Sequence, residues 1–174
     1  EPELPMPLVT EKLNITSGVT KALEGQGIVK IKSEKLYRNP IALREREGGR
    51  VSLNAGQQAI VDAIAAEWEE KPDGKYLIHG ITGSGKTEVY MELIACALEQ
   101  GKEAVVLIPE IALTFQTVLR FYRRFGDRVS VINSRLSAGE RYDQYERAGR
   151  GELDVMIGPR SALFTPFPNL GIIV

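Results

Sequence analysis

The chain has 174 residues, of which 43% are hydrophobic and 26% are charged, and its formal net charge at pH 7 is -1. These values predict a soluble, globular protein with one full domain, or one domain and a small appendage. No apolar run reaches the 18 residues that a membrane span needs, and the first residues lack the pattern of a signal peptide. The single cysteine, Cys96, excludes an internal disulfide and suits a reducing cytoplasm.

The first fifty residues predict part of a winged-helix domain. Residues 8–13 and 17–24 have the pattern of two short helices, the second with Ser17 as its N-cap and glycines at its end. Residues 28–32 then alternate like a half-exposed strand, and residues 36–38 provide a return strand. By analogy with other helix-turn-helix modules, the second helix is expected to face DNA.

Domain boundaries follow from this change of pattern. We predict a partial winged-helix domain over residues 1–43, a charged linker with two glycines over residues 44–52, and a nucleotide-binding domain over residues 53–174. Residues 1–7 contain three prolines and cannot supply the earlier helix of a winged helix, so we expect the sequence to begin inside that domain.

From residue 53 the pattern is that of an α/β fold. The predicted helices are 55–68, 87–99, 111–125 and 137–148, and the predicted strands are 76–79, 104–108, 129–132, 155–157 and 170–174. Strands that alternate with helices at this spacing indicate a parallel, doubly wound sheet whose ligand sites lie at the carboxyl ends of the strands. Arg120, Arg123 and Arg124 lie off the apolar stripe of their helix and are predicted to face solvent.

Residues 80–87 (GITGSGKT) match the Walker A pattern G-x-x-x-x-G-K-[ST], between a predicted strand and a predicted helix. Its three glycines, Gly80, Gly83 and Gly85, are expected to take turns with φ > 0 close to a polyphosphate. Lys86 supplies a charge for the β- and γ-phosphates of ATP, and Thr87 supplies a hydroxyl for Mg²⁺. The residues predicted to hold the nucleotide are Gly80, Thr82, Gly83, Ser84, Gly85, Lys86, Thr87 and Glu88.

Three further strand ends have residues suited to a nucleic-acid phosphate, namely 109–114, 133–134 and 158–163. Residues 120–174 also contain nine basic residues, all arginine, against six acidic ones. Arginine binds phosphate in a bidentate manner, so several such loops along one sheet edge could follow a nucleic-acid strand. Each loop alone is equally typical of a turn that starts a helix, and each arginine alone is more typical of a solvated helix face.

Four segments occur together in order: residues 80–90 (GITGSGKTEVY), 109–116 (PEIALTFQ), 137–141 (SAGER) and 158–169 (GPRSALFTPFPN). Together they closely resemble the family of bacterial replication-restart helicases, the primosomal protein N-prime (PriA) family of helicase superfamily 2. The resemblance covers nearly the whole chain. It implies a cytoplasmic, ATP- and Mg²⁺-dependent 3′→5′ DNA helicase that acts at stalled forks and assembles the primosome. The partners it implies are forked DNA, helicase-loading proteins and single-strand DNA-binding protein.

The resemblance also assigns roles to single residues. Gln57 would read the adenine edge, although a surface glutamine on a helix is a simple alternative. A first DNA contact would come from Pro109, Glu110 and Thr114, and a second from Arg160 and Ser161. The one histidine, His79, has no carboxylate or cysteine beside it in the sequence and is interpreted as structural.

Three residues depart from the family pattern: Phe115 stands for a usual proline, Asn133 for a histidine and Pro159 for a threonine. The family's Walker B acid pair, its second lobe with an arginine finger and its zinc-binding cysteines are not in these 174 residues. The chain alone is therefore expected to bind ATP and DNA without turning ATP over.

Two other functions fit the phosphate loop. One is a nucleotide-switch regulator whose winged helix binds duplex DNA without unwinding it. The other is a small-molecule phosphotransferase, for which the chain shows neither an arginine-rich lid nor an acceptor pocket with any clarity. A Walker B pair after Val174 would favour the motor, and a sensor-type asparagine followed by a small helical domain would favour the switch.

Overall fold

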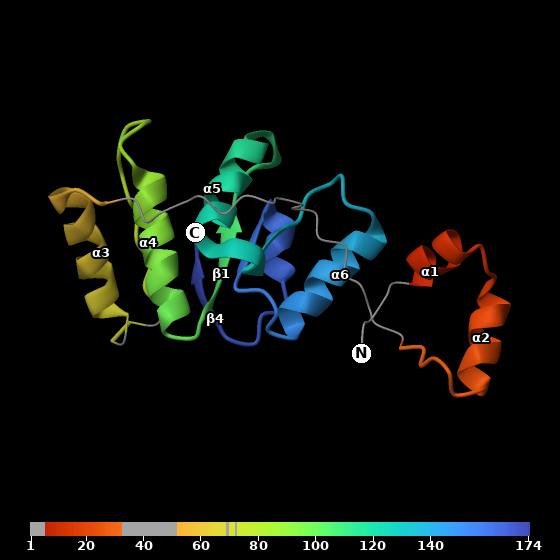
Figure 1. Cartoon of the computed structure of the whole chain (residues 1–174). Coiled ribbons are helices and arrows are strands. Elements are labelled where there is room, and N and C mark those ends of the chain that lie inside the picture. Colours follow the sequence, from red (N-terminus) through yellow and green to blue (C-terminus); the bar gives the residue numbers. More distant parts are fainter. Residues whose placement is uncertain (1–5, 33–51, 69, 72) are drawn as a thin grey trace. The chain divides into compact units, whose positions relative to one another are not determined.

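The computed structural model describes residues 6–32, 52–68, 70–71 and 73–174, and the chain divides into two compact units, residues 1–36 and 37–174 (Figure 1). No helix in these described ranges is long and apolar enough to cross a membrane.

The first unit contains the two predicted helices, α1 (Met6–Leu13) and α2 (Ser17–Gly25). The N-cap position of α2 is Thr16, one residue before the predicted Ser17. The strand predicted over 28–32 is wrong, because the backbone there turns back to α2 instead of joining a ladder. The Ile31 N–H donates to the Glu24 carboxylate at 3.0 Å. The return strand, the 43/44 domain boundary and nearly all of the predicted linker lie outside the described residues.

The second unit is built on a four-stranded sheet of parallel strands in the order β2-β3-β1-β4. The strands are β1 (Glu103–Leu107), β2 (Val129–Val131), β3 (Val155–Gly158) and β4 (Leu170–Ile173). Each lies within one residue of its predicted bounds. The predicted α/β fold class with a parallel sheet is confirmed.

Within the described part of this unit, four helices accompany the sheet: α3 (Ala55–Glu67), α4 (Lys86–Glu99), α5 (Phe115–Phe125) and α6 (Ala138–Gly149). Single helical turns occur at η1 (Glu110–Ala112), η2 (Gly126–Arg128) and η3 (Arg160–Phe164). The helix predicted from residue 111 begins at Phe115, because the Thr114 hydroxyl accepts the Thr117 N–H and caps a new helix there. Residues 110–112 form the separate turn η1.

The sheet is covered on both faces, as a doubly wound fold requires. On β1, Ala104 and Val106 face the cluster made with α4 and α5, while Val105 faces the cluster made with α6 and η3. All three side chains are buried. Helix α3 does not join either cluster; it packs on α4 through Val61 and Ile64.

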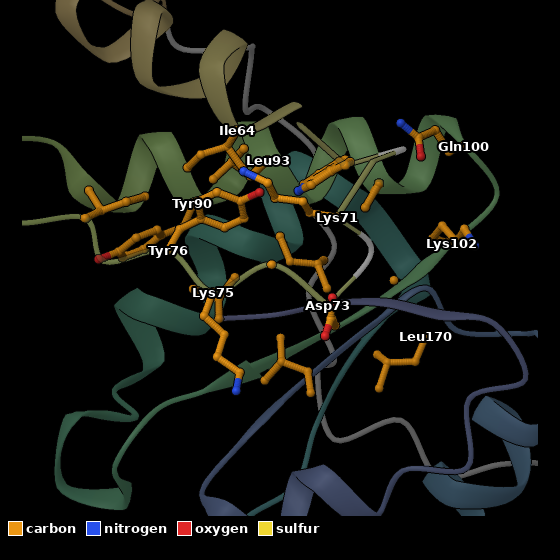
Figure 2. Close-up of a pocket in the computed structure, with 18 of the residues that line it drawn as sticks. Ile64, Lys71, Asp73, Lys75, Tyr76, Tyr90, Leu93, Gln100, Lys102 and Leu170 are labelled. Atoms are coloured by element: carbon orange, nitrogen blue, oxygen red, sulfur yellow. The ribbon is translucent and has the colours of Figure 1, made fainter. Parts of the chain in front are cut away.

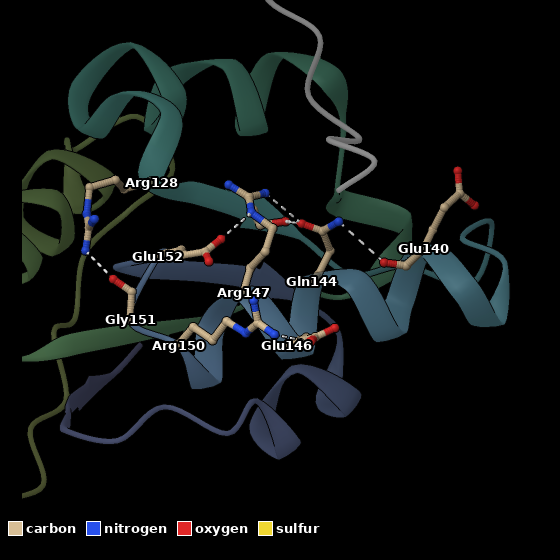
Figure 3. A network of polar contacts seen from close by, with 9 residues as sticks. Arg128, Glu140, Gln144, Glu146, Arg147, Arg150, Gly151 and Glu152 are labelled. Atoms are coloured by element: carbon tan, nitrogen blue, oxygen red, sulfur yellow. Dashed lines mark hydrogen bonds and ion pairs between the residues drawn. The ribbon is translucent and has the colours of Figure 1, made fainter. Parts of the chain in front are cut away.

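A buried polar network attaches α6 to β2 (Figure 3). The Gln144 amide oxygen accepts from the Ser130 hydroxyl at 2.8 Å and from the Arg147 guanidinium at 3.0 Å. Its amide nitrogen donates to the Glu140 carbonyl at 3.4 Å. Gln144 is fully buried, and both its amide oxygen and its amide nitrogen have hydrogen-bond partners. A rotation of α6 about its axis would separate the amide from the Ser130 hydroxyl, so the network fixes the orientation of this helix on the sheet.

The strand predicted over residues 76–79 is not present: no described strand pairs with this segment, and Leu77 is 92% exposed. A cavity of about 920 Å³ lies between this segment and β4 (Figure 2). Lys75, Tyr76 and Ile78 line one part of it, and Leu170 with Ile173 lines another. None of residues 80–87 lines this cavity, so it is separate from the phosphate loop.

Candidate functional site

The phosphate loop takes its shape from two glycines in the left-handed region. Gly83 has φ +84° and Gly85 has φ +81°, as predicted. The prediction is wrong for Gly80, which has no positive φ. A Cβ at Gly80 would lie 2.7 Å from the Ser84 hydroxyl oxygen, so a larger residue there would require the Ser84 side chain to rotate. Gly85 occupies the N-cap of α4, so the loop leads directly into the helix.

Lys86 holds the loop closed on itself. Its ammonium donates to the carbonyl oxygens of Gly80 at 2.6 Å and Ile81 at 2.8 Å. A lysine in this position carries its charge to the inside of the loop, where a phosphate would be enclosed. A triphosphate bound in this loop would have to replace these two carbonyl acceptors at the Lys86 ammonium.

Gln57 connects the start of α3 with the phosphate loop. Its amide nitrogen donates to the Ser84 carbonyl at 3.1 Å. Its amide oxygen accepts the Asn54 N–H at 2.9 Å, and Asn54 in turn accepts the Gln57 N–H at 2.9 Å. This reciprocal capping box fixes the side chain that sequence reasoning assigned to adenine.

The first turn of α4 fits a bound triphosphate. The N–H groups of Lys86 and Thr87 have no acceptor inside the helix, and the helix dipole favours an anion at this end. A Cβ added at Gly83 would meet nothing within 4 Å, so the loop is open on that side. The carboxylate of Glu88 does not lie over the loop; it pairs with Arg120 on α5.

Three more loops share the edge of the sheet at which α4 begins. Parallel strands end at one edge, so the loops after β1, β2 and β3 meet there. Helix α4 runs back to the amino end of β1, and its first turn therefore lies toward the same edge. The fold brings together the four segments that sequence reasoning selected, although they come from different parts of the chain.

Glu110 joins two of these loops. Its carboxylate accepts the Ser134 N–H at 2.7 Å, which ties the loop after β1 to the loop after β2. Hydrogen bonding from Ser134, with a smaller contribution from Arg135, lowers the pKa of the Glu110 carboxyl below its ordinary value. Sequence reasoning placed Glu110 against DNA, whereas here its carboxylate holds a neighbouring loop.

We expect the hydrogen bond between the Ser134 N–H and the Glu110 carboxylate to weaken in acid. Because the folded-state pKa of Glu110 is lowered, its contribution is complete above the pKa of the unfolded chain and is lost as pH falls through the folded-state pKa. In NMR spectra the Ser134 amide signal should therefore move with a midpoint below that of an ordinary glutamate. Glu110→Gln keeps an acceptor oxygen and should abolish the pH dependence while the amide stays protected. A midpoint at or above the ordinary pKa of a glutamate would contradict this role of the hydrogen bond.

The other residues predicted to contact nucleic acid differ in whether their polar groups already have hydrogen-bond partners within the protein. Pro109 and Arg160 are exposed, and the Arg160 guanidinium makes no hydrogen bond or ion pair with a described residue. The Thr114 hydroxyl caps α5, and the Ser161 carbonyl accepts the Tyr145 hydroxyl at 3.1 Å. Arg160 is therefore the group of this set that is most available to a ligand.

A family model for "Type III restriction enzyme, res subunit" matches residues 50–166, about two thirds of the chain, including the phosphate loop and all three neighbouring loops. The chain belongs to this family. The matched range begins before α3 and ends in the loop after β3. It therefore covers most of the second unit and leaves out α1 and α2.

Several proteins similar to this chain are named replication restart protein PriA. The Bacillus subtilis protein is 40% identical over 178 residues, which cover 100% of this chain and 22% of the relative. The Synechocystis protein is 51% identical over 143 residues, covering 77% of this chain and 17% of the relative. The Chlamydia pneumoniae protein is 45% identical over 122 residues, covering 70% of this chain and 16% of the relative. The resemblance to the PriA family is confirmed, and the chain spans about a fifth of the length of these relatives.

Sequence reasoning missed three features of this family member's site. Asn54 fixes Gln57, the Ser134 N–H donates to the Glu110 carboxylate, and Arg124 pairs with a buried carboxylate on α4. The Asn-x-x-Gln spacing of a capping box could have revealed the first, but the other two depend on tertiary packing. Within the part of the chain that the structure describes, no three His, Cys, Asp or Glu side chains form a group that could hold a metal ion.

Proposed function

We propose that this chain is the nucleotide-binding part of an ATP-dependent DNA helicase that acts in replication restart. The observation that carries the proposal is the position of the phosphate loop. It starts α4 at the edge of the sheet where the loops after β1, β2 and β3 also end. A motor needs nucleotide and nucleic acid to bind on connected parts of one rigid sheet. The PriA relatives carry the words "replication restart protein" in their names.

In this proposal the phosphate loop binds ATP through its backbone N–H groups and Lys86, and Gln57 contacts the base. Thr87 supplies the hydroxyl that would hold Mg²⁺, which neutralises phosphate charge when it is bound. Residues 81–84 of the loop are exposed and leave room for the triphosphate and the ion. Arg160 contacts a DNA phosphate, with Pro109, Thr114 and Ser161 along the same path.

We further propose the finer properties that the PriA resemblance implies. These are 3′→5′ polarity, action at stalled forks and primosome assembly with helicase-loading proteins and single-strand DNA-binding protein. They also include a cytoplasmic location and a zinc site formed by cysteines that are not among these 174 residues. The domain division at residues 43 and 52, with a partial winged helix before it, belongs to the same proposal.

The test is ATP turnover by a full-length protein that carries this sequence, with and without single-stranded and forked DNA. We expect turnover to rise on addition of DNA. Nucleotide binding without DNA-dependent turnover would contradict the motor and favour the nucleotide switch. Turnover in the isolated 174 residues would contradict the expectation that they only bind.

Arg160→Ala should weaken DNA binding by about tenfold or more, because a charge-assisted contact to phosphate contributes about 1.5–3 kcal/mol. The matched control is Arg150→Ala. Arg150 is the C-cap residue of α6, and its exposed side chain forms an i,i+4 pair with Glu146 at 2.7 Å, a kind of pair that contributes little. Anisotropy of a labelled oligonucleotide measures both variants. Equal losses in the two would show general electrostatic attraction and not a contact at Arg160.

A further inference from the structure

Two acidic residues of α4 pair with two basic residues of α5. The Arg124 guanidinium lies 2.5 Å from the Glu92 carboxylate, and Arg120 pairs with Glu88. Sequence reasoning placed both arginines in solvent, which is wrong for Arg124: its side chain is 14% exposed and that of Glu92 is 4% exposed. The two helices run beside one another in Figure 1. We call these two pairs the α4–α5 ladder.

The spacing of the ladder gives it a mechanical property that a single pair lacks. Both acids and both arginines are four residues apart, so each couple lies on one face of its helix. Two rungs fix the rotation of each helix as well as the distance between them. The Glu92–Arg124 pair is almost inaccessible to solvent, and separating a buried pair leaves uncompensated charge. The helices are therefore held to move together.

The two joined helices begin at the two parts of the proposed site. Glu88 directly follows Thr87, in the first turn of the helix that the phosphate loop starts. Helix α5 begins directly after residues 109–114, the loop beside the proposed path of nucleic acid. The Glu88–Arg120 rung thus lies within two turns of both helix starts.

We propose that the α4–α5 ladder couples the binding of nucleotide to the binding of nucleic acid, with Arg120 and Arg124 as positioning residues. A shift of α4 when the loop closes on a triphosphate is carried to the loop after β1, and nucleic acid there acts back on α4. Coupling of this kind is reciprocal, so each ligand changes the affinity for the other by the same factor. This inference rests on the proposed function.

The experiment is a linkage measurement on the 174-residue chain, which needs no turnover. The dissociation constant of a fluorescent, non-hydrolysable ATP analogue with Mg²⁺ is measured alone and with saturating oligo(dT). We expect the two constants to differ by about fivefold or more, the usual range of such coupling. In Arg120→Gln the ratio should fall toward one, with the Glu92–Arg124 pair retaining part of the coupling, while each separate affinity stays close to that of the parent chain. Arg120→Lys keeps the charge and should keep part of the coupling.

Arg123→Gln is the matched control, because Arg123 is an exposed neighbour on the same helix and should leave the ratio unchanged. Thermal unfolding of every variant separates lost coupling from lost structure. A ladder that only supports the fold would lower the unfolding temperature and leave the ratio unaltered, which would overturn the inference. Binding of both ligands without coupling in the parent chain would also overturn it, and the proposed function would stand. Failure of either ligand to bind would overturn both.

Discussion

Lys86→Ala is expected to weaken binding of an ATP analogue by about 100-fold. The ammonium is already directed into the loop, at 2.6 Å and 2.8 Å from two of its carbonyl oxygens. A charged hydrogen bond contributes about 1.5–3 kcal/mol, and 1.4 kcal/mol is tenfold in affinity. Titration calorimetry with a non-hydrolysable analogue and Mg²⁺ measures the effect in the 174-residue chain. In a full-length protein the same variant should abolish DNA-dependent turnover.

The loop also loses two internal hydrogen bonds in this variant, so its structure must be checked. Lys86→Arg keeps the charge but cannot place a compact ammonium between the same carbonyls, and it should recover little affinity. Lys75→Ala removes an exposed lysine ahead of the loop and should bind as the parent chain does. An affinity in Lys86→Ala within threefold of the parent value would mean that the triphosphate is held elsewhere.

Gly158→Ala is expected to destabilise the second unit by about 1–3 kcal/mol, the usual cost of overpacking. A Cβ at Gly158 would lie 2.6 Å from the Ile132 carbonyl oxygen and 3.2 Å from the Ala162 Cβ. The first of these is a backbone atom, so β3 must move away from Ile132, the residue that follows β2. For a chain of this size the unfolding temperature should fall by about 2–4 °C per kcal/mol. Gly158→Val should have a larger effect.

Gly149→Ala provides the matched control. Gly149 ends α6, and a Cβ there would meet only Pro166, at 3.7 Å, an ordinary contact. Since alanine is also favoured over glycine in a helix, this variant should equal or exceed the parent chain in stability. Calorimetric scans of both variants give the comparison. An unchanged unfolding temperature in Gly158→Ala would show that β3 and Ile132 have room to separate without loss of stability.

Much of the fold could be predicted because local patterns and tertiary packing agree. The apolar runs of β1 and β3 are buried on both faces of the sheet, which is the arrangement such runs indicate. The capping box of Ser137 and Glu140 sets the start of α6 at the predicted residue. The phosphate loop could be located because its glycines are required by backbone geometry at Gly83 and Gly85.

The remaining features could not be predicted because they depend on residues distant in sequence. Residues 76–79 have the composition of a strand, but a strand requires a hydrogen-bonded neighbour and no described strand provides one. Arg124 lies off the apolar stripe of α5, and only the position of Glu92 on another helix brings it into the interior. For the same reason the sequence does not indicate the hydrogen bond between the Ser134 N–H and the Glu110 carboxylate, because the two residues lie in different loops.

The two engaged ends of the Gln57 amide affect how variants at this position are interpreted. A substitution that removes contact with a base also removes the donor to the Ser84 carbonyl and the acceptor for the Asn54 N–H. The preference for adenine over other bases and the rigidity of the loop are therefore confounded in any Gln57 mutant. Only a comparison of ATP with GTP and with inorganic triphosphate in the same variant separates them, because the last of these has no base to recognise.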